Sequence, residues 1–168
     1  MDIHCELSIR ILLSKVGEAG VAFLRDEVIQ AISCIVGTAN PVRTTQALLQ
    51  HGLEHKNANI RKQTAIQVYT AVERLGLNRI FQPNSSFSAK DNSLPSSSYG
   101  SGTFCLVERL ILAVSRFLMD GSLETRLAGR KLLGFLLGHA ECDRYLRKFL
   151  TGQAQVTVLE AADQLRKA

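Results

Sequence analysis

The chain has 168 residues and a formal net charge of +5, with an isoelectric point near 9.2. Its hydrophobic share of 46% and charged share of 21% are ordinary for a soluble globular protein, and its length fits one domain with a real core. Aromatic residues make up only 6% and Trp is absent, which favours packed helices over a sheet. The positive charge suggests an acidic partner, which could be nucleic acid, an anionic membrane or an acidic protein surface.

Targeting and membrane signals are weak. The opening "MDIHCELSIR" has acidic residues where a secretory signal is cationic. No apolar run approaches the roughly 18 to 20 residues that a membrane span needs. The four cysteines are scattered without a CxxC pair, and three lie among apolar residues at helical spacing, which predicts reduced core thiols. We therefore expect an intracellular, cytoplasmic protein.

In chain order, the apolar spacing predicts helices separated by short turns. A first helix is marked by Leu7, Ile11 and Leu12 and ends near "KVGEAG". The others are expected at residues 21–36, 44–54, 59–75, 107–118, 123–137, 142–150 and 156–167. The helix at 107–118 has the clearest apolar stripe, and the helix at 123–137 is apolar on two faces, as expected for a helix packed between neighbours.

A polar segment interrupts this series. Residues 83–103, "PNSSFSAKDNSLPSSSYGSGT", hold eight serines, two prolines and two glycines in 21 residues. Such a composition buries too little apolar surface to offset its ordering entropy. We expect a flexible insertion, within a single domain that covers residues 1–168.

The helical segments resemble one another at a fixed distance. A shift of 36 residues places Leu24, Arg25 and Ile32 over Ile60, Arg61 and Val68. A shift of 65 places Arg61 and Val68 over Arg126 and Leu133, and without the 21-residue serine segment this shift becomes 65 − 21 = 44. Helical hairpins repeating at about 36 to 44 residues are typical of the HEAT and armadillo class. The predicted fold is an all-α solenoid, or α-α superhelix, of about four helical hairpins.

In such a solenoid the turns inside the hairpins share one edge. These turns are "VGEAGVAFLRDE", "EHKNANIRKQ" and "MDGSLETRLAGRK". We expect a basic edge suited to an acidic protein surface. Its cations are Arg25, Lys56, Arg61, Lys62, Arg126, Arg130 and Lys131, and the aligned apolar residues Phe23 and Leu24 add contact area at one end.

Several of these residues have a second, structural interpretation. The repeated arginines Arg61 and Arg126 could instead bond the neighbouring repeat, and Lys56, Lys62 and Arg130 could form a solvated face. Asn57 is interpreted as a turn or N-cap residue, because Asn side chains satisfy free backbone donors at a helix start.

The segments "FLRDEVIQAI", "HGLEHKNANIRKQTA", "AVERLG" and "RLILAVSRFLMDGSLETRLAGRKLLGFLLGH" resemble the TOG domains of the Crescerin family, the TOG array regulators of axonemal microtubules. The resemblance runs from about Leu7 to Leu150, on both sides of the serine-rich segment. It implies a flat HEAT-repeat paddle whose intra-repeat turns bind tubulin, in proteins of the cilium, axoneme and cytoskeleton. By position, the resemblance implies that the tubulin-facing turns are residues 23–25, 56–62 and 122–126, which adds Asn57 and Ser122 to the candidate binding residues.

Catalytic and cofactor signals are weak. His139 and Cys142 form a lone H-x-x-C, whereas a zinc site needs about four ligands. We expect no enzyme activity, cofactor, metal or membrane contact. We also expect no nucleic-acid partner, since no aromatic platform that could stack bases accompanies the basic residues. Two functions remain: a tubulin- or microtubule-binding module, and a HEAT-repeat scaffold that binds another protein.

Overall fold

The computed structural model of the protein describes residues 2–81 and 106–167, with side chains from His4 onward. The predicted insertion at residues 83–103 lies outside these ranges. The helices of the described residues are α1 (Asp2–Glu18), α2 (Ala22–Thr38), α3 (Pro41–Gly52), α4 (Ala58–Leu75), α5 (Leu77–Ile80), α6 (Leu106–Leu118), α7 (Leu123–Leu136), α8 (Cys142–Phe149) and α9 (Gly152–Lys167).

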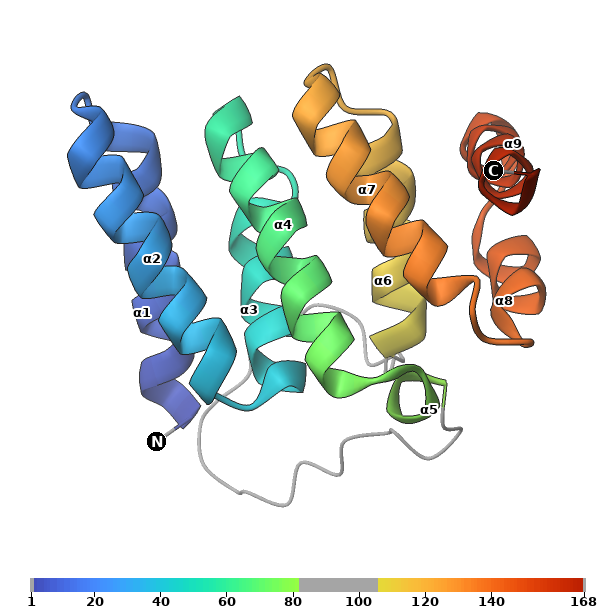
Figure 1. The fold of residues 1–168 in the computed structure, drawn as a ribbon, viewed down its shortest axis with the longest axis horizontal. Coiled ribbons are helices and arrows are strands. Elements are labelled where there is room, and N and C mark those ends of the chain that lie inside the picture. The colour runs from blue at the N-terminus through green and yellow to red at the C-terminus, as the bar shows by residue number, and fades with distance from the viewer. Residues whose placement is uncertain (1, 82–105, 168) are drawn as a thin grey trace, which may run out of the picture.

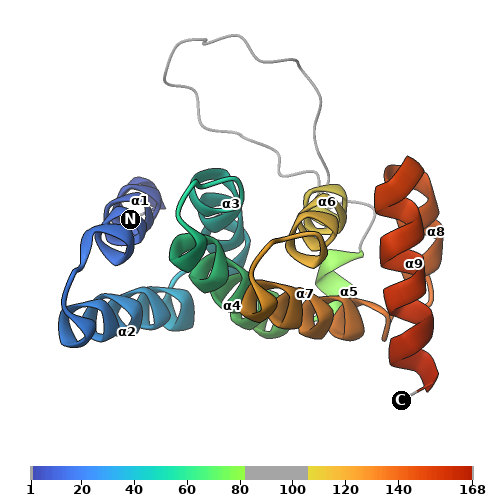
Figure 2. The same ribbon diagram turned by 90° about the horizontal axis from the view of Figure 1, so that it is seen from above.

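The helices pair into hairpins that stack side by side (Figure 1). Helices α1, α3 and α6 form one layer, and α2, α4 and α7 form the other (Figure 2). No strand occurs among the described residues. The predicted all-α helical-repeat solenoid is therefore confirmed.

The last hairpin departs from this regular stacking. Helix α9 is seen end-on in Figure 1 and along its length in Figure 2, so it crosses the direction of the earlier helices. It packs on α6 and α7, while α8 packs on α6. The two-layer repeat is thus closed at this end by a crossing helix.

The core follows the predicted stripes in the second half of the chain. All six apolar positions predicted for the stripe of α6 are buried: Val107, Leu110, Ile111, Val114, Phe117 and Leu118. Helix α7 buries Leu132 and Leu133 on different faces and contacts α4, α6 and α9. The two-faced helix is confirmed.

The predicted face of the first helix is partly wrong. Leu7 and Ile11 are about half exposed, and α1 instead buries Ile9, Leu13 and Val16 against α2 and α3. This helix is apolar on more than one side, and among the described residues only the side facing α2, α3 and α4 is covered. Spacing alone could not identify which side that is.

Local signals determine where the helices begin and end. Helix α3 starts at Pro41 rather than at the predicted residue 44, because the Asn40 side chain accepts a 3.0 Å hydrogen bond from the Val42 amide and proline is favourable at the first helical position. Gly76 ends α4 as expected and adopts a φ of 80°, which favours glycine. The short helix α5 that follows was not predicted; Ile80 and Phe81 anchor it in the core.

Glycine allows two hairpins to pack closely. A Cβ atom built on Gly52 would lie 1.9 Å from Thr64 Oγ1, and one on Gly129 would lie 2.8 Å from Phe117 Cβ. Helix α3 thereby approaches α4, and α7 approaches α6.

The cysteine prediction holds only in part. Cys142 is buried, and burial together with the nearby Asp143 charge raises the pKa of its thiol to about 11. Cys5 is partly buried, whereas Cys34 is exposed and so is not a core thiol. Cys34 lies on a side of α2 that no described helix covers, although its neighbours are apolar. Cys105 lies outside the described residues.

Candidate functional site

The turns inside the first three hairpins lie along one edge of the stack, as predicted (Figure 1). We call this surface the turn edge; it comprises residues 17–25, 53–62 and 119–126. Each turn joins a helix of the first layer to a helix of the second. The edge therefore brings together segments about 36 and 65 residues apart in the sequence.

The repeated arginine closes its own turn in all three hairpins. In each case the guanidinium donates a hydrogen bond to the carbonyl oxygen of the residue six positions earlier. The pairs are Arg25 with Ala19 at 2.9 Å, Arg61 with His55 at 2.9 Å, and Arg126 with Asp120 at 2.7 Å. In each turn the guanidinium satisfies a carbonyl oxygen that accepts no hydrogen bond from a described backbone amide, so the recurrence of this arginine has a structural cause.

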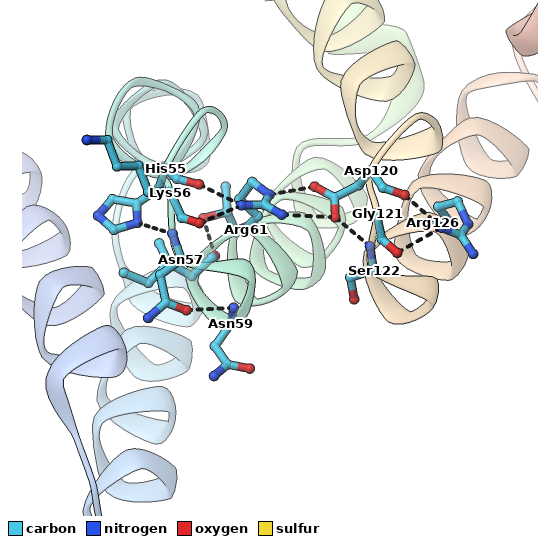
Figure 3. A network of polar contacts seen from close by, with 11 residues as sticks. His55, Lys56, Asn57, Asn59, Arg61, Asp120, Gly121, Ser122 and Arg126 are labelled. Carbon is cyan, nitrogen blue, oxygen red and sulfur yellow. Dashed lines mark hydrogen bonds and ion pairs between the residues drawn. The ribbon is translucent and has the colours of Figure 1, made fainter.

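Arg61 also joins the second hairpin to the third (Figure 3). Its Nε atom lies 2.6 Å from one carboxylate oxygen of Asp120, and its Nη2 atom lies 3.3 Å from the other. Asp120 also accepts a 2.8 Å hydrogen bond from the Ser122 amide at the start of α7. This two-point contact fixes the second turn relative to the third.

The contacts shift both ionisation equilibria. Partial burial raises the pKa of Asp120. Hydrogen bonds from Arg61 and the Ser122 amide, together with the charges of Arg61 and Arg126, lower it by more than burial raises it. The pKa of Asp120 therefore lies below its ordinary value. The hydrogen bond to Asp120 raises the pKa of Arg61. Both groups are therefore charged at neutral pH.

Asn57 connects the second turn to the first. Its side-chain oxygen accepts a 2.9 Å hydrogen bond from the Asn59 amide, which confirms the predicted N-cap of α4. Its amide nitrogen donates across the hairpins to the carbonyl of Gly17 at 3.3 Å. Together with the Arg61–Asp120 pair, this bond holds the three turns in a fixed relative position.

Lysine and arginine side chains further along α4 and α7 are also engaged. Lys62 lies 2.7 Å from Glu124 in the next hairpin. Arg130 reaches Gln164 of α9 at 3.4 Å and so lies against the last hairpin. Four predicted cations of the turn edge (Arg25, Arg61, Lys62 and Arg126) thus have partners within the protein.

The exposed side chains of the edge are of mixed character: several are apolar, Glu54 and Glu124 are acidic, and Lys56 is basic. Phe23 is 72% exposed and Leu24 54% exposed in the first turn of α2. Lys56 is exposed in the second turn and makes no ion pair with any described residue. Ser122 begins α7 without a side-chain capping bond and is partly exposed.

Sequence reasoning missed two acidic partners on this edge, Asp120 and Glu124. Neither residue has an acidic counterpart at the repeat spacing, since the positions aligned with them are His55 and Asn59. A useful signal was available in "MDGS", because Asp is a common turn residue and Asp120 stands two residues before Ser122, the N-cap of α7.

No group of three or more His, Cys, Asp or Glu side chains in the part of the chain that the structure describes could hold a metal ion. No described helix is long and apolar enough to cross a membrane.

The fold and the edge together define the class of protein: an α-helical repeat solenoid whose intra-repeat turns are locked side by side. Over 166 residues, or 99% of its length, the chain is 29% identical to TOG array regulator of axonemal microtubules protein 1 of Mus musculus. Over 148 residues, or 88% of its length, it is 28% identical to Crescerin-like protein che-12 of Caenorhabditis elegans. These matches confirm the resemblance: the chain is related to the Crescerin TOG-domain family.

The relatives are much longer proteins. The chain spans 8% of the mouse protein and 10% of the nematode protein. No family model and no solved structure matches the chain significantly.

Proposed function

We propose that this chain is a TOG-like module that binds tubulin or microtubules through its turn edge. It acts by binding and not by catalysis, in the cytoskeleton of the cilium or axoneme. The observation that carries the proposal is the fixed alignment of three turns by the Arg61–Asp120 and Asn57–Gly17 contacts. The names of the two relatives, which refer to axonemal microtubules and to Crescerin, support the choice of partner.

We further propose that residues 1–168 form a single domain with an insertion at residues 83–103. The helices on the two sides of this segment continue one stack, because α3 contacts α6 and α4 contacts α7. Helix α5 and the start of α6, which flank this segment in the sequence, lie at the end of the stack opposite the turn edge (Figure 1).

The chemistry of binding follows from what the edge leaves exposed. Phe23 and Leu24 supply apolar anchors, and exposed aromatic residues contribute strongly when a partner buries them. Lys56 supplies a positive charge, which mainly speeds encounter with an acidic surface and makes it sensitive to salt.

The test is co-sedimentation and size-exclusion chromatography with purified tubulin at low and moderate salt. Phe23→Ser should weaken binding by roughly tenfold. Lys56→Glu should weaken it by a few-fold, with the difference disappearing at high salt. Leu7→Ser and Arg10→Glu, at exposed positions within α1 and away from the turns, are the matched controls and should bind like the parent chain.

Lys62→Glu is not a clean variant for this purpose. Its carboxylate would face Glu124, whose oxygen lies 2.7 Å from the lysine nitrogen in the parent chain. Repulsion between the two helices would then lower stability, and a loss of binding would have two explanations. Lys56→Glu has no such neighbour in an ion pair.

The alternative is a HEAT-repeat scaffold that binds a partner other than tubulin. The observation in its favour is that the arginines of the turn edge make bonds within the protein. If the parent chain shows no interaction with tubulin even at low salt, the scaffold function replaces the tubulin-binding function. If it binds but Phe23→Ser and Lys56→Glu bind equally well, the turn edge is the wrong surface.

A further inference from the structure

A second exposed surface lies between α4 and α7 in the second layer of helices. It is a groove of about 300 Å³ lined by Lys62, Ile66, Tyr69, Glu124, Leu127, Ala128 and Lys131. We call it the α4–α7 groove. The Lys62–Glu124 ion pair closes the end near the turns, and an edge-to-face contact between Tyr69 and Phe135, with ring centres 6.3 Å apart, lies at the other end.

The apolar side chains of this groove are only partly covered. Ile66 is 37% exposed and Leu127 is 50% exposed. Along α4 the groove runs from Lys62 to Tyr69, a distance of about 10 Å at 1.5 Å per residue. That length matches about two turns of a helix lying between α4 and α7.

Repeat stacking does not require an apolar groove here. The shifts of 36 and 65 residues identify the equivalent positions between α2 and α4. Those positions are Asp26, Gln30, Ser33, Asn59, Lys62, Gln63 and Ile66, of which all but Ile66 are polar or charged. The surface between α2 and α4, which belong to the same layer as α7, is therefore polar at these positions. The apolar character of the α4–α7 groove needs a different cause.

The charge at the rim indicates the kind of partner. Lys131 is exposed and forms no ion pair with any described residue, whereas the charge of Lys62 is balanced by Glu124. The rim thus carries one uncompensated positive charge beside exposed apolar side chains. An occupant with complementary chemistry has apolar residues on one face and a carboxylate at their edge.

We propose that the α4–α7 groove binds a short amphipathic helix of a protein partner. This helix would place two apolar residues, three or four positions apart, against Ile66 and Leu127, and an acidic residue near Lys131. Phe23 and Leu24 belong to the first hairpin, whereas the groove lies between the second and the third, and it shares only Lys62 and Glu124 with the turn edge. The inference therefore does not rest on tubulin binding.

The probe is a synthetic helical peptide with two leucines four positions apart and flanking glutamates. Its matched control has lysines in place of the glutamates. Chemical-shift mapping on the ¹⁵N-labelled full chain should show the acidic peptide perturbing amides around Ile66 and Leu127, and the lysine peptide perturbing them much less. The proposal is overturned if the perturbed amides cluster elsewhere, or if the two peptides bind alike.

Three variants distinguish specific binding in the groove from non-specific hydrophobic binding. Leu127→Ser should weaken the acidic peptide by roughly tenfold, and Lys131→Glu should weaken it by roughly threefold while improving the lysine peptide. Leu7→Ser, which removes another half-exposed leucine on α1, should change nothing. All three should keep the melting temperature of the parent chain within about 2 °C, because the positions are exposed.

The tubulin assay distinguishes the two proposals. Leu127→Ser should leave tubulin co-sedimentation unchanged, whereas Phe23→Ser should leave peptide binding unchanged. If the peptide does not bind and the chain instead forms a dimer that Leu127→Ser dissociates, a second copy occupies the groove and the proposal is wrong.

Discussion

The Arg61–Asp120 pair should be the strongest single polar contribution to the stacking of the hairpins. The Asp120 side chain is 8% exposed and that of Arg61 is 23% exposed, so water replaces their contact poorly. Asp120→Ala removes a two-point charge-assisted contact and the acceptor for the Ser122 amide. Charged hydrogen bonds contribute about 1.5–3 kcal/mol each when buried, and partial exposure reduces this, so we expect a loss of about 2 kcal/mol. For a chain of this size the melting temperature should fall by roughly 4–8 °C.

A double-mutant cycle measures the interaction itself. Urea denaturation of Arg61→Ala, Asp120→Ala and the double variant should give a coupling free energy of about 1–2 kcal/mol. The exposed pair Arg116–Glu54 is the matched control; it also joins the second and third hairpins, at 3.4 Å, and its coupling should be below about 0.5 kcal/mol. If the effects of Arg61→Ala and Asp120→Ala simply add, the pair does not hold the two turns together and the fixed edge loses its physical basis.

Three further predictions test the core, the helix approach and the ionisation of the edge. The folded-state pKa of Asp120 lies below its ordinary value of 3.8, so the ionised carboxylate stabilises the fold above pH 3.8 and this stabilisation is lost as the pH falls through the folded-state pKa. The urea midpoint should therefore fall less steeply on acidification in Asp120→Asn than in the parent chain. Equal slopes would contradict this. Gly129→Ala should lower the free energy of unfolding by about 1–2 kcal/mol, because α6 leaves no room for a Cβ atom there. Gly134→Ala should raise it by about 0.5–1 kcal/mol, because a Cβ atom at that position would lie 3.9 Å from its nearest neighbour. Thermal melts that order the two variants the other way would disprove the close approach of α7 to α6. Leu132→Asp should abolish cooperative unfolding by burying an unpaired charge, while Leu127→Asp on the same helix should melt like the parent chain within a few degrees by circular dichroism.

The fold could be predicted from the sequence because its signals are local and recur. Helical spacing located the apolar stripes of α6 and α7, and the repeat shifts identified the hairpins. The orientation of α9 could not be predicted, since a crossing helix has the same apolar spacing as a stacked one. The exposed face of α1 was also misassigned, because Leu7 and Ile11 are as apolar as the residues that α1 buries.

The alignment of the turns could be predicted from the sequence, but the partners of their charged side chains could not. The alignment of the turns follows from the stacking of repeats, which the sequence shows. The partners of the cations do not follow from it, because Asp120 and Glu124 lie in the next hairpin, about 60 residues from Arg61 and Lys62. A contact between hairpins depends on the rotation of each helix, and the repeat shift does not specify that rotation.

The three arginines show how recurrence and recognition can be separated in a repeat protein. A residue that recurs in every repeat has a structural role common to every repeat. Here that role is to donate a hydrogen bond to a carbonyl oxygen of the turn. Residues that break the pattern have no such explanation: at the position of Phe23 the next hairpin has Asn59, and at the position of Leu127 the preceding one has Lys62. Both of these apolar side chains are exposed although the fold accepts a polar residue at the same place. The arginines have a structural role that accounts for their recurrence, whereas Phe23 and Leu127 belong to the two surfaces that we propose bind partners. Variants at these two positions therefore test partner binding more directly than variants of the arginines do.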